Sequence, residues 1–127
     1  MRELSMDFEV RAQARYVPMS AQKVRLVVDK VRGMNADDAL DQLSFMPQAA
    51  AKQVYKLIHS AIANAEENYG LVRDDLYIAE IHANEGPTRR WRRFGARGRF
   101  KPILRRSSHI TVVLAEYEYE SEDLGRL

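Results

Sequence analysis

The sequence predicts an α+β fold: three helices packed on a small three-stranded antiparallel sheet with a long protruding β-hairpin. Three observations favour it: apolar and polar residues alternate near both ends of the chain, three intervening stretches carry apolar residues at helical spacing, and residues 84–102 lack any apolar periodicity. With 127 residues, 46% of them hydrophobic, the chain suits a single domain. We expect a globular body over about 8–84 and 103–115, an extended basic hairpin over about 85–106, and an acidic C-terminal tail over about 116–127.

The first strand is expected over residues 8–16, where apolar and polar side chains alternate strictly. Arg11 and Arg15 share the polar side. Pro18 ends the strand because proline has no N–H to donate to a neighbouring strand. The side expected to face the core carries Phe8, Val10, Ala12, Ala14 and Tyr16.

Three helices are expected to follow, each with its own boundary residues. Ser20 is a suitable N-cap for the first helix, which carries a valine stripe and stops at Gly33. Asn35 caps a short second helix. Pro47 is expected to start the third and longest helix, which runs to about residue 68 before Gly70 ends it. Two further strands are expected at about 76–83 and 103–114, and an antiparallel hairpin is the simplest connection between them.

The segment between those strands carries the strongest chemical signal. Residues 86–110 hold nine basic side chains and no acidic one. Eight of the nine are arginines, whose guanidinium groups bind phosphate in a bidentate manner, and the interleaved aromatics suit stacking on unpaired RNA bases. The alternative is a solvated basic loop or a targeting patch. The cations are Arg89, Arg90, Arg92, Arg93, Arg97, Arg99, Lys101, Arg105 and Arg106, set among Trp91, Phe94 and Phe100.

A second basic group precedes residue 33, where six basic residues stand against one acid over residues 11–32. This group is either a second phosphate-contacting face or an ordinary charged surface. Its members are Arg11, Arg15, Lys23, Arg25, Lys30 and Arg32.

Several functional classes find no support in the sequence. The chain has no cysteine, no Gly-rich phosphate loop, and three histidines without metal-ligand spacing, so no metal or cofactor is expected. Ser107, Ser108 and His109 do not form a catalytic triad, because adjacent strand residues point to opposite faces. We therefore do not expect an enzyme. Without an apolar run of about 20 residues or a signal peptide, we expect a soluble cytosolic protein that has no membrane partner.

Four sequence motifs together resemble one protein family. The chain carries SAQKVRLV at 20–27, SAIANAE at 60–66, EGP at 85–87 and RRSSHITV at 105–112. In this order and spacing, over about residues 11–114, they are similar to the bacterial large-subunit ribosomal protein L-twenty-two family. Two features depart from the family pattern. Phe94, Gly95 and Ala96 stand where Pro-Arg-Ala is common, and an acidic tail runs past the usual end, where it either extends the last strand or stays disordered.

The resemblance implies a structural protein of the cytoplasmic ribosome that binds large-subunit rRNA, assists its assembly and lines the nascent-peptide exit tunnel with its hairpin. Its implied partners are that rRNA, neighbouring ribosomal proteins and the nascent polypeptide, with no homo-oligomer expected. Lys23 and Arg25 would face rRNA, as would Arg105, Arg106, Ser108 and His109 on the returning strand. The implied tunnel tip is Arg92, Arg93, Phe94, Gly95, Ala96, Arg97, Gly98 and Arg99.

Three rival functions remain open at the sequence level. The nearest is a free-standing RNA-binding or RNA-chaperone protein with the same basic hairpin. A small enzyme using the carboxylate or histidine pairs would need a pocket that gathers them. An adaptor that docks acidic proteins through the hairpin would keep its partner after nuclease treatment.

Overall fold

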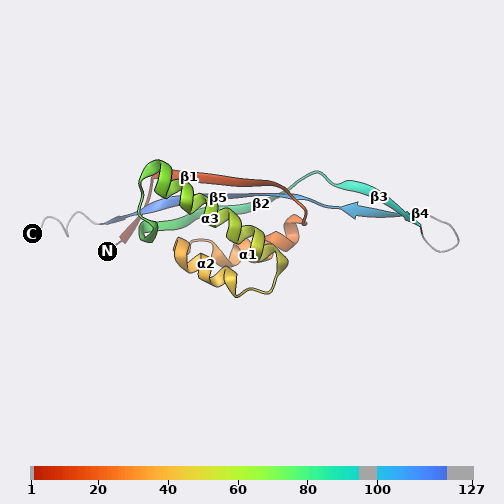
Figure 1. Ribbon diagram of the computed structural model, residues 1–127, viewed down its shortest axis with the longest axis horizontal. Helices are drawn as coiled ribbons and strands as arrows, with labels where there is room; N and C mark the ends of the chain where they lie inside the picture. Colours follow the sequence, from red (N-terminus) through yellow and green to blue (C-terminus); the bar gives the residue numbers. More distant parts are fainter. Residues whose placement is uncertain (1, 95–99, 120–127) are drawn as a thin grey trace, which may run out of the picture.

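The computed structural model describes residues 2–94 and 100–119 and has the expected α+β architecture (Figure 1). A three-stranded antiparallel sheet of order β1-β5-β2 carries the helices, and a separate two-stranded hairpin, β3-β4, extends from one end. The elements are β1 (Arg2–Val17), α1 (Ala21–Val31), α2 (Ala36–Ser44), α3 (Ala49–Tyr69), a 3-10 turn (Arg73–Asp75), β2 (Leu76–Glu85), β3 (Arg89–Phe94), β4 (Phe100–Arg105) and β5 (Ser108–Tyr119).

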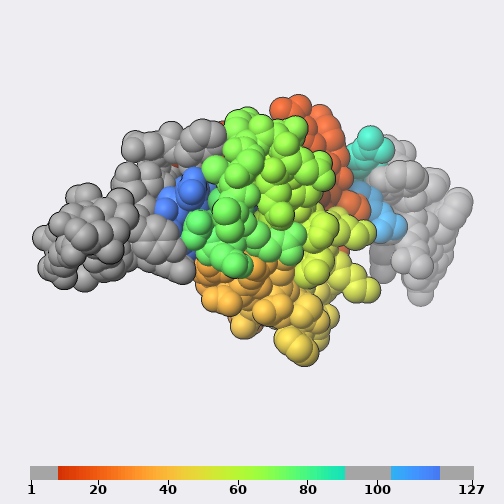
Figure 2. All heavy atoms as spheres, turned by 60° about the vertical axis from the view of Figure 1, so that its left-hand side comes forward, coloured from red at the N-terminus to blue at the C-terminus, as the bar shows by residue number. Residues whose placement is uncertain are grey.

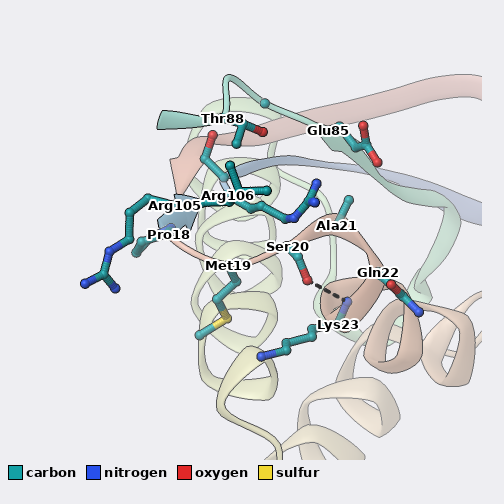
Figure 3. Close-up of a pocket in the computed structure, with 13 residues that line it drawn as sticks. Pro18, Met19, Ser20, Ala21, Gln22, Lys23, Glu85, Thr88, Arg105 and Arg106 are labelled. Carbon is teal, nitrogen blue, oxygen red and sulfur yellow. Dashed lines mark hydrogen bonds between the residues drawn. The ribbon is translucent and has the colours of Figure 1, made fainter. Parts of the chain in front are cut away.

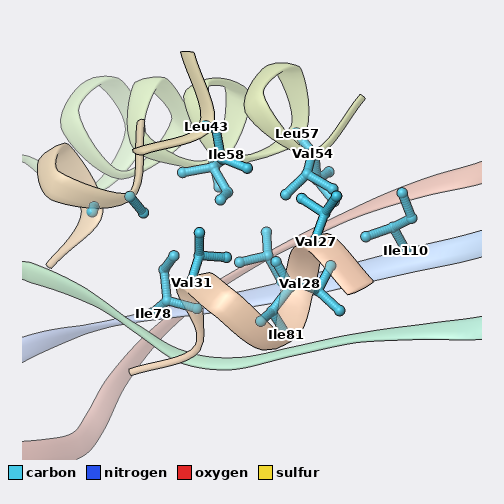
Figure 4. Packing of buried hydrophobic residues seen from close by; sticks show 14 of the residues in the cluster. Val27, Val28, Val31, Leu43, Val54, Leu57, Ile58, Ile78, Ile81 and Ile110 are labelled. Atoms are coloured by element: carbon cyan, nitrogen blue, oxygen red, sulfur yellow. The ribbon is translucent and has the colours of Figure 1, made fainter. Parts of the chain in front are cut away.

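The core lies between the helices and one face of the sheet. The predicted valine stripe of α1 is fully buried, and it packs between α3 and the strands (Figure 4). Ile58 of α3 enters the core from the helix side, and Ile81 of β2 enters it from the sheet side. Full burial of such a side chain stabilises the fold by roughly 1.5–3 kcal/mol. In Figure 2 the atoms of α3 lie beside those of β1.

The helix boundaries agree with the sequence prediction at most positions. The Ser20 hydroxyl accepts a hydrogen bond from the Lys23 amide at 3.4 Å. Asn35 Oδ1 accepts one from the Asp37 amide at 3.0 Å. Gly70 ends α3 with a φ of 65°, a left-handed conformation that favours glycine. These caps are therefore confirmed.

The predicted start of the third helix is wrong by two residues. Gln48 has an extended backbone (φ −66°, ψ 138°), and α3 begins at Ala49 rather than at Pro47. Proline holds φ near −65°, which suits both extended and helical residues. It therefore does not determine which residue is the first in the helix.

The prediction that Tyr16 faces the core is also wrong. Ala14 pairs with Ile110 and Val17 with Ser108, so two residues of β1 oppose the single residue His109. This β-bulge turns Tyr16 outward, where 65% of it is exposed, and makes Val17 the buried residue instead. A strict period of two cannot reveal a bulge, because the extra residue shifts every later side chain to the other face.

The first and last strands of the chain are longer than the alternating pattern indicates. β1 begins at Arg2, and β5 continues to Tyr119, so the first part of the acidic tail pairs in the sheet. Tail residues 120–127 lie outside the described residues. Among the described residues, no helix has both the length and the apolar character needed to cross a membrane.

Candidate nucleic-acid interface

The base of the hairpin is held by contacts between its two connecting segments. The Gly86 amide donates to the Ser107 carbonyl oxygen at 2.9 Å, and the Ser107 hydroxyl donates to the Pro87 carbonyl oxygen at 2.7 Å. A Cβ atom at Gly86 would lie 2.5 Å from the Ser107 hydroxyl oxygen, so only glycine fits without displacing it. This joint connects the body sheet to β3 and β4 (Figure 1).

The hairpin base concentrates positive charge. Arg89 pairs directly with Arg105 across the two strands, and both side chains are exposed, as are those of Arg90 and Arg106. Like charges opposite each other destabilise a strand pair. Within the described parts of the chain, none of these arginines has an acidic group within ion-pair distance. A polyanion would supply the missing counter-charge.

A cleft of about 580 Å³ lies between the hairpin base and the start of α1 (Figure 3). Lys23, Arg105 and Arg106 line it together with the Ser20 cap, and Glu85 is its acidic residue. The N-terminus of α1 adds partial positive charge to this cleft. The cleft therefore combines three cations with a helix end, an arrangement that suits phosphate.

A second cleft, of about 530 Å³, shares Arg105, Arg106 and Ser107 with the first. Its charged residues are Arg89, Arg105 and Arg106, and among the described residues no acidic side chain lines it. Tyr16 supplies its aromatic ring. In Figure 3 the side chains of Arg105 and Arg106 point in different directions, so this short segment presents guanidinium groups to both clefts.

The predicted cations of α1 divide into two groups. Arg25 donates through Nε to the Ala83 carbonyl oxygen at 3.1 Å, and Arg32 donates to the Ile81 carbonyl oxygen at 2.9 Å. Both carbonyls belong to β2, an edge strand of the sheet. The two arginines therefore cover a sheet edge as well as carrying charge. Lys23 and Lys30 are exposed.

Four other predicted contact residues lie in different settings. Arg11 and Arg15 are exposed on β1, and Arg15 Nε donates to Gln13 Oε1 at 3.2 Å. His109 is partly exposed, and its Nδ1 accepts a hydrogen bond from the Tyr16 amide. Ser108 is fully buried, so its side chain does not reach the surface.

The remaining predicted residues belong to the outer hairpin. Their backbone forms β3 and β4 at Trp91, Arg92, Arg93, Phe94 and Lys101. The other predicted tip residues lie outside the described residues: Gly95, Ala96, Arg97, Gly98 and Arg99. The structure thus brings Lys23 together with Arg105 and Arg106 in the first cleft, and Arg89 together with the same two arginines in the second.

Negative charge gathers away from this base, around α2 and the 3-10 turn. Burial raises the pKa of Asp37 above its ordinary value of 3.8, although the nearby Arg73 opposes this shift. Arg73 Nε lies 3.1 Å from Glu66 Oε1 and 3.8 Å from Asp37 Oδ1. Among the described residues, no three histidine or carboxylate side chains gather as a metal site would require. The two ends of the body thus differ in the sign of their charge.

Sequence reasoning missed Tyr16 as a surface residue of the second cleft. Its aromatic ring ends an alternating strand two residues before Pro18, which is consistent with either burial or exposure. The signal that distinguishes the two is the bulge opposite His109, and pairing register is a property of the folded sheet.

Comparison with known proteins agrees with this geometry. Residues 12–115 match the family described as ribosomal protein L22p/L17e. The large ribosomal subunit protein uL22 of Clostridium novyi (strain NT) is 48% identical over 108 residues, which cover 85% of this chain and 97% of the relative. The protein of the same name from Thermoanaerobacter sp. (strain X514) is 49% identical over 110 residues, covering 87% and 99%. The one from Cutibacterium acnes is 52% identical over 107 residues, covering 84% and 70%. The chain therefore belongs to the ribosomal protein L22p/L17e family.

Proposed function

We propose that this protein is a structural component of the large ribosomal subunit in the cytoplasm. It binds large-subunit rRNA, assists its assembly, and lines the nascent-peptide exit tunnel with its hairpin. The observation that carries the proposal is the positive charge where Arg89 and Arg105 lie opposite each other at the hairpin base, with no acidic partner among the described residues. Family membership and the names of the relatives support it.

The mechanism is charge neutralisation combined with shape, and it involves no catalysis. Lys23, Arg105 and Arg106 hold rRNA phosphates at the cleft beside α1. Arg25 and Arg32 use some of their N–H groups on β2, and Arg32 also forms an ion pair with Asp29 at 2.9 Å. The N–H groups that these contacts leave over are directed to RNA. The other proposed contacts are Arg11, Arg15, Lys30, Arg89, Arg90 and His109, with Trp91, Arg92, Arg93, Arg97, Arg99 and Lys101 along the hairpin.

Neighbouring ribosomal proteins and the nascent polypeptide complete the set of proposed partners, and the protein acts as a single copy. The segment from Arg92 to Arg99 is the part proposed to face the tunnel. The hairpin suits this role because its two strands project from the body as a separate sheet.

The test is sucrose-gradient sedimentation of a native lysate at low and high salt, followed by binding of the purified protein to large-subunit rRNA. We expect the protein to travel with the large subunit and to resist a moderate salt wash. The double variant Arg105→Gln/Arg106→Gln should lose rRNA affinity, and its plot of log affinity against log salt should be shallower by about two. The matched control Lys52→Gln/Lys56→Gln changes two exposed cations of α3, away from both clefts.

Two results would contradict the proposal. If the protein stayed in the light fractions while still binding RNA, a free-standing RNA-binding or RNA-chaperone protein would be the better description. If its binding to a partner survived nuclease treatment, the protein would be better described as an adaptor that docks acidic proteins.

A further inference from the structure

Tyr16 has a backbone conformation that its residue type disfavours. Its φ is 57°, and it is the one non-glycine residue with positive φ in the described part of the chain. This left-handed region suits glycine or asparagine, because a Cβ atom is crowded there. The local backbone alone would therefore favour a residue other than tyrosine.

The contacts of Tyr16 hold it in place without burying it. Its amide donates to His109 Nδ1 at 3.0 Å, and its ring meets the His109 ring edge-on, with centroids 4.9 Å apart. Yet 65% of the residue remains exposed. Backbone strain that the surrounding structure maintains is characteristic of functional positions. A large, oriented and mostly uncovered aromatic ring is a surface suited to stacking.

The surroundings of the ring specify what would stack on it. Tyr16 lines the second cleft with Arg89, Arg105 and Arg106, and in the part of the chain that the structure describes no acidic residue lines this cleft. Its volume of about 530 Å³ falls within the range of roughly 300–1,000 Å³ that is usual for sites of small ligands. An aromatic face beside several guanidinium groups matches the two parts of a nucleotide, the base and its phosphate.

We infer that Tyr16 stacks on an unpaired RNA base in this cleft, while Arg89, Arg105 and Arg106 hold the adjoining phosphates. The inference rests on the proposed function and adds one base-binding position to it. The bulge opposite His109 places Tyr16 in the lining of the cleft, and the hydrogen bond of Ser107 holds the segment that carries Arg105 and Arg106 beside Arg89.

The test compares variants of the full-length protein on in vitro transcribed large-subunit rRNA. Tyr16→Gly removes the ring and relieves the positive φ, so the variant should fold at least as stably as the original chain. We expect it to bind roughly 5- to 150-fold more weakly, the loss typical of one stacked base. Its salt dependence should not change, since stacking is not ionic. Tyr16→Phe, which keeps the ring, should bind within about twofold of the original.

Chemical probing of the same complexes locates the contact. Tyr16→Gly should lose protection at one or a few unpaired bases, while hydroxyl-radical protection of the RNA backbone stays as before. Tyr16→Asn, another residue tolerated at positive φ, serves as a second ring-free variant.

The possible results separate this inference from the proposed function. If the original protein binds the rRNA and Tyr16→Gly binds equally well, the inference fails and the proposed function stands. If the weaker binding comes with a shallower salt dependence, the arginine contacts have been disturbed, and stacking is not the cause. If the original protein does not bind large-subunit rRNA in preference to unrelated RNA, the proposed function itself fails.

Discussion

The hydroxyl of Ser107 donates a 2.7 Å hydrogen bond to the carbonyl oxygen of Pro87, twenty residues earlier in the chain. This bond joins the segment that leaves the body sheet to the segment that returns to it. The Gly86 amide adds a second bond, to the Ser107 carbonyl oxygen. Together they connect the hairpin to the body at the place where its positive charge is concentrated.

Substitutions at this joint should be coupled. Gly86→Ala should destabilise the protein by about 1–3 kcal/mol, because the new Cβ collides with the Ser107 hydroxyl. Ser107→Ala should cost about 0.5–1.5 kcal/mol through the lost hydrogen bond. The double variant should cost less than the sum, because the colliding oxygen is gone. Urea denaturation of the four proteins measures this coupling, and strictly additive costs would show that the collision is unimportant.

Arg25 and Lys23, two residues apart on α1, should differ in what their loss affects. Arg25→Met should lower the free energy of unfolding by about 1–2 kcal/mol, because it leaves the Ala83 carbonyl oxygen without its guanidinium partner. Lys23→Met should change stability by less than about 0.5 kcal/mol and should mainly weaken RNA binding. Thermal denaturation and a filter-binding assay distinguish the two effects. Equal stability losses in the two variants would argue against the role of Arg25 at the sheet edge.

Removing a buried side chain of α3 should lower the free energy of unfolding strongly. Ile58 is fully buried between the helices and the sheet, so Ile58→Ala should cost about 2–5 kcal/mol. Phe45 is 87% exposed, and Phe45→Ala should change stability by no more than about 0.5 kcal/mol. Denaturant unfolding of both variants checks the contrast. A large loss from Phe45→Ala would mean that this ring contributes to packing despite its exposure.

Asp37 should make the stability depend on pH in a defined direction. Burial raises its pKa in the folded state above the ordinary value of 3.8, so the folded state binds a proton more tightly than the unfolded state does. The stability of the original protein relative to Asp37→Asn should therefore fall as pH rises through the interval between those two pKa values. Above that interval the difference should be constant. NMR titration of the Asp37 carboxyl measures the pKa directly, and a value below 3.8 would reverse the expected slope.

The parts of the fold that follow from local sequence rules could be predicted. The valine spacing of α1, the Ser20 and Asn35 caps and the Gly70 stop all depend on residues close together in the chain. The long segment without apolar periodicity correctly indicated a hairpin, because it has no regular apolar face to pack against the body. The start of α3 escaped prediction because Pro47 fits either side of a helix boundary.

The candidate site could be predicted only in part. The concentration of arginines in residues 86–110 is visible in the sequence, since charge needs no folding to be counted. The different roles of Lys23 and Arg25 are not visible in the sequence. They depend on the fact that Arg25 reaches the carbonyl oxygen of Ala83, 58 residues away in the chain. The burial of Ser108 is likewise decided by the strands on both of its sides.

By itself, the sequence determined the fold class, the helix caps and the basic character of the hairpin, because each depends on local periodicity, backbone preference or charge. Only the tertiary structure decided that Tyr16 points outward, that Arg25 and Arg32 cover the edge of β2, and that Arg105 and Arg106 line both clefts. These features depend on strand register and on contacts between distant segments. Register is set when β1, β5 and β2 pair, and a shift of one residue reverses the face of every side chain that follows.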